Sequence, residues 1–433
     1  MDLISSRNLP NRLSISFPIW ALQNTAPGGA YADLDRFVRE HVERGFNCIR
    51  FDDGAGLIYD ATGHLRRTVP IVEPFPGFTH DIRQSWCTGN GGECDIFGRL
   101  IELLKVAKKY NVFVILSSWY YLHTYWYCGD EARNRKLHAI APHDRYRFFA
   151  EELDRILSEL RTRNLLDRVA AAEVFNEADG LPFINGYGAV NHLSVPELQQ
   201  FREEHEAAIA FLRSRHPDVL FAYDTYTPWT DVDQMPRNLQ VWNFHLYCVW
   251  SVYSLLEGNL LTPGVDVEKS SQAESIRKFC KEKLVSLEDV RRCRQGKLAA
   301  AEDWYRRIWL YSNLAPEKMP ELDTLLSAAF DQNYAAFQKK LDEGLAEALR
   351  IRDAVVPEAP LVLAEGITYC GNNHIAWEEK SDRYWTFLEY AVERYREVGL
   401  WGCVLRTCCG PEDPGWNLRK NDLLRLNRLF QGY

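Results

Sequence analysis

Short apolar runs alternate with longer segments of helical period along the whole chain. The runs are rich in β-branched and aromatic residues, which is typical of buried strands. The segments between them repeat apolar residues every three or four positions, which predicts amphipathic helices. The predicted strands cover residues 14–20, 48–51, 112–118, 169–176, 220–224, 241–247, 361–365 and 402–406.

Helix-start and helix-stop residues bound the intervening segments. A helix over residues 33–44 is expected to end at Gly45, because glycine is favoured just past a helix C-terminus. Another begins at Ser194 and carries Pro196 in its first turn, where the missing N–H costs nothing. The other predicted helices cover residues 95–110, 144–163, 331–353, 382–398 and 423–430.

Eight strands that alternate with helices favour an α/β fold, a closed (β/α)8 TIM barrel. A doubly wound sheet fits less well, because no glycine-rich dinucleotide turn follows the first strand. We expect residues 1–433 to form a single barrel domain. Residues 249–330, between the sixth and seventh strands, are charged and helical in period, and we expect them to form a helical insertion within it.

The composition narrows the classes of partner. With 51 basic and 60 acidic residues the net charge is −9, and no basic cluster is suited to nucleic-acid phosphates. No window reaches the roughly 18 apolar residues of a membrane span, and the N-terminal pattern is not that of a secretion signal. We therefore expect a cytoplasmic protein that binds neither nucleic acid nor membrane.

The 11 cysteines are scattered, and several fall in predicted strands, which favours reduced thiols. Cys87, Cys94 and Cys128 lie on neighbouring loops, and Cys408 and Cys409 form a vicinal pair. No CxxC or HExxH spacing supports a metal site among them. We expect no metal and no other cofactor.

Two glutamates stand where predicted strands end, which is where a parallel barrel collects its reactive groups. Glu177 follows the fourth strand and Glu365 ends the seventh, so we expect the two carboxylates to face each other across the barrel mouth. Packing alone does not explain an unpaired carboxylate at two such ends. Hydrolysis of a glycoside with retention uses two carboxyls about 5–5.5 Å apart, one as acid and one as nucleophile.

Four motifs, in this order and on these strands, resemble those of clan A retaining glycoside hydrolases, most closely family 5. GFNCIRF resembles the second-strand motif with its substrate-site arginine, and FNEAD resembles the Asn-Glu motif that ends strand four. FHLY resembles the His-x-Tyr of strand six, and LVLAEG resembles the nucleophile strand. The resemblance covers nearly the whole barrel and implies double displacement through a covalent intermediate.

The resemblance implies a role for each matching residue. Glu177 would be general acid and then base, Glu365 the nucleophile, and Asn176 a contact to the sugar 2-hydroxyl. Arg50 and Tyr247 would contact the nucleophile.

Two of the matching residues have structural alternatives. Arg50 could instead pair with Glu173 inside the barrel. His245, which the resemblance implies as a substrate contact, could simply bond a neighbouring loop.

The chain departs from the family pattern at strand eight. Such enzymes usually have a tryptophan platform there, whereas GCVLRTCCG offers Arg406 and Thr407. We expect Arg406 among the substrate contacts and expect Trp416, from the loop PEDPGWNL, to supply the platform. Trp119 begins the loop WYYLHTYWYC, whose aromatic rings are suited to stacking on a sugar or, alternatively, to packing against the insertion or another subunit.

The sugar and the mode of action are implied by resemblance alone. The chain is similar to intracellular β-mannosidases of subfamily 18, which implies release of terminal mannose from small oligosaccharides such as Man-β-1,4-GlcNAc. Long insertions that wall off one end of the cleft, and a cytoplasmic location, also favour exo action. The alternatives are a β-glucosidase and an endo-acting mannanase or glucanase.

Two other classes of protein fit the sequence less well. A non-catalytic sugar-binding pseudoenzyme is disfavoured by two intact glutamates, and a metal-dependent hydrolase needs His and Asp ligands that SFPIW and GCVLR lack. The aromatic loop and the inserted helices slightly favour a homo-oligomer over a monomer.

Overall fold

A computed structural model describes residues 3–18, 21–51, 55–70, 75, 77–78, 92–119, 129–180, 193–258, 260, 264–296, 302–368 and 375–433. Eight parallel strands close into a barrel in the order β1-β10-β9-β8-β7-β6-β5-β2. They are β1 (Leu13–Ser16), β2 (Cys48–Phe51), β5 (Phe113–Leu116), β6 (Val169–Glu173), β7 (Phe221–Thr225), β8 (Val241–Leu246), β9 (Leu361–Gly366) and β10 (Gly402–Val404). The predicted (β/α)8 barrel is confirmed, and each predicted strand overlaps one of these eight.

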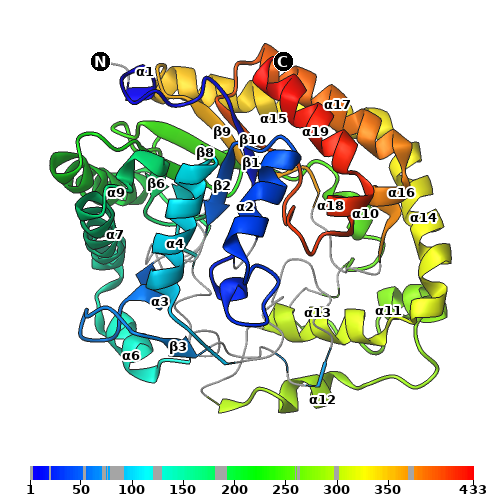
Figure 1. The fold of residues 1–433 in the computed structure, drawn as a ribbon. Coiled ribbons are helices and arrows are strands. Elements are labelled where there is room, and N and C mark those ends of the chain that lie inside the picture. The colour runs from blue at the N-terminus through cyan, green and yellow to red at the C-terminus, as the bar shows by residue number, and fades with distance from the viewer. Residues whose placement is uncertain are drawn as a thin grey trace.

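Helices surround the barrel (Figure 1). The seven helices predicted from the sequence correspond to α2 (Leu34–Glu43), α4 (Ile96–Lys109), α7 (Arg145–Thr162), α9 (Val195–Arg215), α15 (Tyr334–Val355), α17 (Asp382–Glu397) and α19 (Lys420–Gln431). Their starts follow from local chemistry. Asp33 and Asp95 accept hydrogen bonds from the first turns of α2 and α4, and Ser194 forms a capping box with Glu197 at the start of α9.

Further helices and one small sheet lie in the described part of the chain. The remaining α-helices are α1 (Leu3–Ser6), α3 (Ala55–Ile58), α6 (Glu131–Ala139), α10 (Trp250–Tyr253), α11 (Ser271–Ile276), α12 (Leu287–Arg292), α13 (Glu302–Asn313), α14 (Met319–Gln332), α16 (Trp377–Lys380) and α18 (Pro414–Leu418). A separate antiparallel pair joins β3 (Val69–Pro70) to β4 (Glu93–Cys94). In these ranges no helix is both long and apolar enough to cross a membrane.

Several helices lie in the described residues between β8 and α15. They include α10 to α14, and Figure 1 shows α11, α12 and α13 at the edge of the view opposite α15, α17 and α19. Their grouping as an insertion within one domain, with the bounds 249–330, stays a prediction.

The connection from β7 to β8 lacks the helix that usually follows a strand in this fold. Residues 226–240, all of which the structure describes, contain turns and bends but no helix. On the outside of the barrel, α9 packs against α7 and β7, and α15 packs against β8 and α17. The β7–β8 unit therefore adds no helix to the outer layer, and part of this connection lines the site described below.

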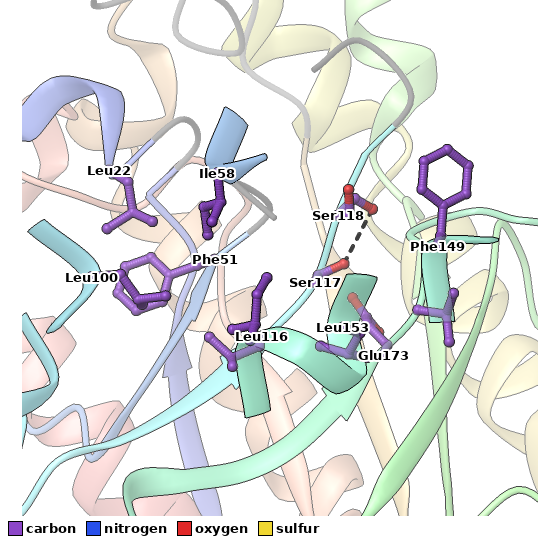
Figure 2. A pocket seen from close by; sticks show the side chains of 12 residues that line it. Leu22, Phe51, Ile58, Leu100, Leu116, Ser117, Ser118, Phe149, Leu153 and Glu173 are labelled. Atoms are coloured by element: carbon purple, nitrogen blue, oxygen red, sulfur yellow. Dashed lines mark hydrogen bonds between the residues drawn. The ribbon is translucent and has the colours of Figure 1, made fainter. Parts of the chain in front are cut away.

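A small cavity lies behind the strand ends (Figure 2). Its volume is about 20 Å³, which is enough for about one water molecule. Apolar side chains from Phe51, Leu116 and Leu153 form much of its wall, and Glu173 and Ser117 add polar atoms. Its size makes it a packing gap and not a ligand site.

Candidate active site

Two strand ends bring a pair of glutamates together. Glu365 lies in β9, one residue before that strand ends, and Glu177 lies in the turn just past β6. One carboxylate oxygen of each and one ring nitrogen of His245 all lie within 4.8 Å of one another. The Glu177 side chain is 14% exposed and that of Glu365 is 4% exposed. Both acids therefore lie at the base of a pocket and not on the outer surface.

Strand register explains why His245 reaches this pair. β8 and β9 are parallel neighbours, and His245 is paired with Glu365 after an irregularity between Phe244 and His245. This irregularity sets the two side chains beside each other at the same strand ends. The structure thereby brings together three of the residues named from the sequence.

Glu365 is held by three donors from different elements. Arg50 Nη1 donates to Oε1 at 3.2 Å, and Asn176 Nδ2 donates to the same oxygen at 3.1 Å. The Tyr247 hydroxyl donates to Oε2 at 2.5 Å. Both carboxylate oxygens are therefore engaged, which fixes the orientation of the group.

Arg50 combines both arrangements that the sequence left open. Its Nη2 donates to Glu173 Oε1 and to Asn176 Oδ1, each at 2.6 Å, while its Nη1 reaches Glu365. The guanidinium is fully buried, so it supports the nucleophile candidate from inside the barrel and has no surface for a substrate. Burial raises the pKa of Glu173, and the charge of Arg50 opposes that rise.

His245 bridges two carboxylates. Its Nδ1 lies 3.0 Å from Glu177 Oε1, and its Nε2 lies 3.1 Å from Asp224 Oδ1. Burial disfavours a charged imidazole, but the charges of Asp224 and Glu365 outweigh it and hold the pKa of His245 well above its usual value. His245 is thus a cation that donates to both carboxylates, and not merely a contact to a neighbouring loop.

Glu177 has the environment of a proton donor. Burial raises its pKa, and the negative charges of Glu365 and Asp224 raise it further. The hydrogen bond and the charge of His245 act in the opposite direction. A carboxyl with a raised pKa beside a carboxylate is the pairing that separates an acid from a nucleophile.

Asp224 is a functional residue to which sequence reasoning assigned no role. Its Oδ1 accepts a hydrogen bond from the backbone N–H of Glu177 at 3.0 Å. Glu177 has a φ of 55°, in the left-handed region that non-glycine residues rarely adopt, so this bond helps to hold a strained backbone. The charges of His245 and Arg50 outweigh the effect of burial and lower the pKa of Asp224. Its position at the end of LFAYD was the available signal.

A cavity of about 460 Å³ opens above the two glutamates, a size within the usual range for small-molecule sites. Trp119, His245 and Tyr247 line it with the acids, and their contact with a substrate stays a prediction. The structure adds lining residues to which sequence reasoning assigned no role. These are Tyr226, Thr227, Trp229, Leu246, Trp250, Asp303, Trp304, Arg307 and Lys340.

The added lining residues show what the helical region contributes. Asp303, Trp304 and Arg307 belong to α13, so a helix from outside the barrel repeat forms part of the wall. The clearest sequence signal was the aromatic residue that follows each strand end, in TYTPWT and LYCVW.

Glu177, His245 and Glu365 form a group with the geometry of metal ligands, the one such group found within the described ranges. Both ring nitrogens of His245 already face carboxylates, so a metal ion could bind His245 only by replacing one of these hydrogen bonds. The donor set therefore suits proton chemistry better than metal binding.

Comparison with known proteins agrees with this geometry. Residues 17–252, more than half of the chain, match a family described as sugar-binding cellulase-like. The chain belongs to this cellulase-like family. No curated protein matches it.

The fold of this cellulase-like protein also occurs in a solved structure. A putative glycoside hydrolase from Parabacteroides distasonis has a TM-score of 0.62 at 18% identity, covering 97% of this chain and 94% of the other. A family 5, subfamily 4 broad-specificity endoglucanase from Clostridium longisporum has a TM-score of 0.49 at 13% identity, covering 98% of each. An exo-β-1,4-mannosidase from the Opitutaceae bacterium strain TAV5 has a TM-score of 0.38 at 12% identity, covering 97% of this chain and 58% of the other. The first likeness shows the glycoside-hydrolase-like fold, and the other two carry no argument about the substrate.

The expectation that Arg406 contacts the substrate is wrong. Its guanidinium is buried and forms ion pairs with Glu378 at 2.9 Å, Glu379 at 2.7 Å and Asp413 at 3.0 Å. The first two lie on α16 and the third caps α18, so Arg406 ties these helices to the end of β10.

The expectation that Trp416 forms the sugar platform is also wrong. The side chain is fully buried on α18. Its ring packs under the Arg44 guanidinium at 4.2 Å and near His41 at 4.7 Å, and its Nε1 donates to Glu40 at 2.9 Å. These residues belong to α2 and its C-terminus, so Trp416 joins two outer helices.

Three expectations fall outside the described residues. These are the aromatic loop after Trp119, half of the long loop that the sequence predicts over residues 52–93, and the loop cysteines Cys87 and Cys128.

Proposed function

We propose that this cellulase-like protein is a retaining, exo-acting β-glycosidase, namely a β-mannosidase that releases terminal mannose from short β-1,4-linked oligosaccharides such as Man-β-1,4-GlcNAc. The observation that supports hydrolysis is the pairing of Glu177 with Glu365, whose nearest oxygens lie within 4.8 Å. That spacing suits retention, whereas inversion leaves about 6.5–9.5 Å for a water molecule. The choice of mannose rests on the sequence resemblance.

In the first step, Glu365 attacks the anomeric carbon while the bond from that carbon to the leaving oxygen breaks. Glu177 donates its proton to the leaving oxygen, so the leaving sugar departs as an alcohol. The carboxylate that Glu177 becomes is paired with the imidazolium of His245, 3.0 Å away. This charge pairing favours the transfer at the moment it occurs.

In the second step, Glu177 takes a proton from water, and the resulting oxygen attacks the anomeric carbon. The bond to Glu365 breaks and the sugar leaves with its original configuration. Asn176 holds the sugar 2-hydroxyl in this proposal, and its amide lies beside the nucleophile oxygen, 3.1 Å from Oε1. A cytoplasmic location and a homo-oligomeric state stay predictions.

Hydrolysis of para-nitrophenyl β-mannoside, β-glucoside and β-galactoside tests the proposal. We expect rapid release from the mannoside and a loss of at least about 10³-fold in kcat for Glu365→Gln, because the nucleophile is removed. Glu389→Gln, on the outer helix α17, is the matched control and should keep wild-type activity.

Each other outcome contradicts a defined part of the proposal. Release from the glucoside alone would be consistent with the proposed mechanism but would show that the enzyme is a β-glucosidase and not a β-mannosidase. Activity only on the interior bonds of long chains would replace exo with endo action. No release from any β-glycoside, with saturable sugar binding, would identify a binding protein.

A further inference from the structure

A second pocket continues from the first. Its volume is about 650 Å³, and it shares Tyr226, Thr227 and Trp229 with the pocket above the glutamates. The two pockets are therefore neighbours across a common wall. This second pocket is lined by the turn after β6, the segment after β7, the start of α9 and one residue of α15.

The common wall is an aromatic ridge that an ordered turn presents to solvent. Tyr226 is 58% exposed and Trp229 is 47% exposed, although both rings are large and partly apolar. The Trp229 backbone N–H donates to Thr227 Oγ1 at 3.3 Å, and the Tyr226 N–H donates to Asp179 Oδ1 at 3.0 Å. Exposed rings on a fixed backbone are suited to stacking against the C–H face of a pyranose.

The ridge lies on the acid's side of the site. Asp179, which anchors Tyr226, is two residues beyond Glu177. In a retaining hydrolase the leaving sugar is bonded to the oxygen that the acid protonates. The route from Glu177 over the ridge is therefore the route of the leaving group.

The lining of the second pocket indicates a neutral polar ligand. Asp179, Asp231 and Glu347 contribute carboxylates, and Thr230 and Gln234 contribute a hydroxyl and an amide. Among the described lining residues there is no lysine or arginine, so an anionic ligand would find no counter-charge. Sugar hydroxyls can donate to carboxylates and amides of this kind.

We propose that a leaving group of at least two neutral sugars crosses the Tyr226–Trp229 ridge and that its second sugar occupies this pocket. The inference rests on the proposed function, because it takes Glu177 as the acid. The preferred substrate is then longer than a disaccharide, although only one terminal residue is released.

The test compares kcat/KM for β-1,4-mannobiose, mannotriose and mannotetraose, whose leaving groups contain one, two and three sugars. We expect about a tenfold rise from the disaccharide to the trisaccharide in the wild type, the size of one good aromatic stacking contact. Trp229→Ala removes the ridge, and Glu347→Trp fills the pocket from α15. Both should bring the trisaccharide-to-disaccharide ratio close to one.

Leu418→Ala is the control for a lost exposed apolar side chain, because Leu418 is 67% exposed on α18 and lines neither pocket. It should keep the wild-type ratio, and thermal unfolding should show all three variants folded. A wild-type ratio near one, or a ratio that survives both pocket substitutions, would overturn the inference.

Calorimetric titration of Glu365→Gln with the same oligosaccharides separates the two proposals. Affinity that rises with chain length, without turnover by the wild type, would support the second pocket as a sugar site and contradict the proposed hydrolase function. Turnover or binding that is independent of chain length would reject the pocket. No binding of any of the three would reject both.

Discussion

Glu365 receives hydrogen bonds from side chains on three separate parts of the barrel, and one of these donors has its own support. Thr407, just beyond β10, accepts a bond from the Gly366 N–H at 2.9 Å, and its Oγ1 lies 3.4 Å from the Tyr247 hydroxyl. The Thr407 N–H also donates to the Gly366 carbonyl at 2.8 Å. Thr407 therefore braces both β9, which carries Glu365, and Tyr247.

Thr407→Val tests Thr407 as a positioning residue. The substitution keeps the shape but leaves the buried Gly366 N–H without its acceptor, so we expect a loss of about 1–3 kcal/mol in the free energy of unfolding. We also expect kcat to fall about tenfold while KM stays within about twofold of the wild-type value. A misplaced Glu365 weakens the binding of the transition state more than the binding of the substrate. Thr407→Ser should restore kcat, and an unchanged kcat in the valine variant would show that Thr407 serves stability alone.

His245→Asn tests the coupling of the imidazolium to the acid. His245 lowers the pKa of Glu177, so its removal should raise that pKa. Glu177 must be protonated for the first step, and activity is lost as the pH rises through its pKa. The alkaline limb of kcat/KM should therefore move to higher pH in the variant, alongside a lower maximum. A shift to lower pH would contradict the assignment of Glu177 as the acid.

At the scale of elements, the end of β10 depends on one buried cation with three carboxylates around it. Removing Arg406 would leave Glu378, Glu379 and Asp413 in a buried site without their counter-charge. We expect Arg406→Met to lower the free energy of unfolding by about 3–5 kcal/mol, measured by urea denaturation. The folded fraction should keep a wild-type KM. A KM raised many-fold at an unchanged free energy of unfolding would instead show that Arg406 contacts the substrate.

The elements also show which features of the fold and of the site could be predicted from the sequence. The eight strands and Glu177 and Glu365 were predictable, because alternating periods and acids at strand ends are local features. The role of Asp224 was not, because it depends on the unusual backbone of Glu177 and on the neighbouring strand. Arg406 and Trp416 were misplaced because proximity to a strand end does not reveal which way a side chain faces.

At the scale of the whole molecule, buried carboxyls link stability to pH. Burial raises the pKa of Asp179 to about 7, with Asp224 and Glu177 adding to the rise. A carboxyl whose pKa is higher in the folded state contributes stability that is full below its unfolded pKa, near 4, and is lost as the pH rises through about 7. This contribution is therefore weakest in mildly alkaline solution.

Asp179→Asn should remove this pH dependence. Relative to the wild type, the variant should gain free energy of unfolding on going from pH 4 to pH 8, on the order of 3 kcal/mol. Urea denaturation at the two pH values measures the difference. If the substitution changed the free energy of unfolding equally at both pH values, Asp179 would have to be ionised in the folded protein.

Covalent trapping tests the central claim most directly. A fluorinated mannosyl fluoride reacts readily because of its good leaving group, while the ring fluorine slows hydrolysis of the intermediate. We expect mass spectrometry of the treated protein to find one added sugar, and peptide mapping to locate it on Glu365. An adduct on another carboxylate, or hydrolysis with inversion and no adduct, would contradict the assignment of Glu365 as the nucleophile.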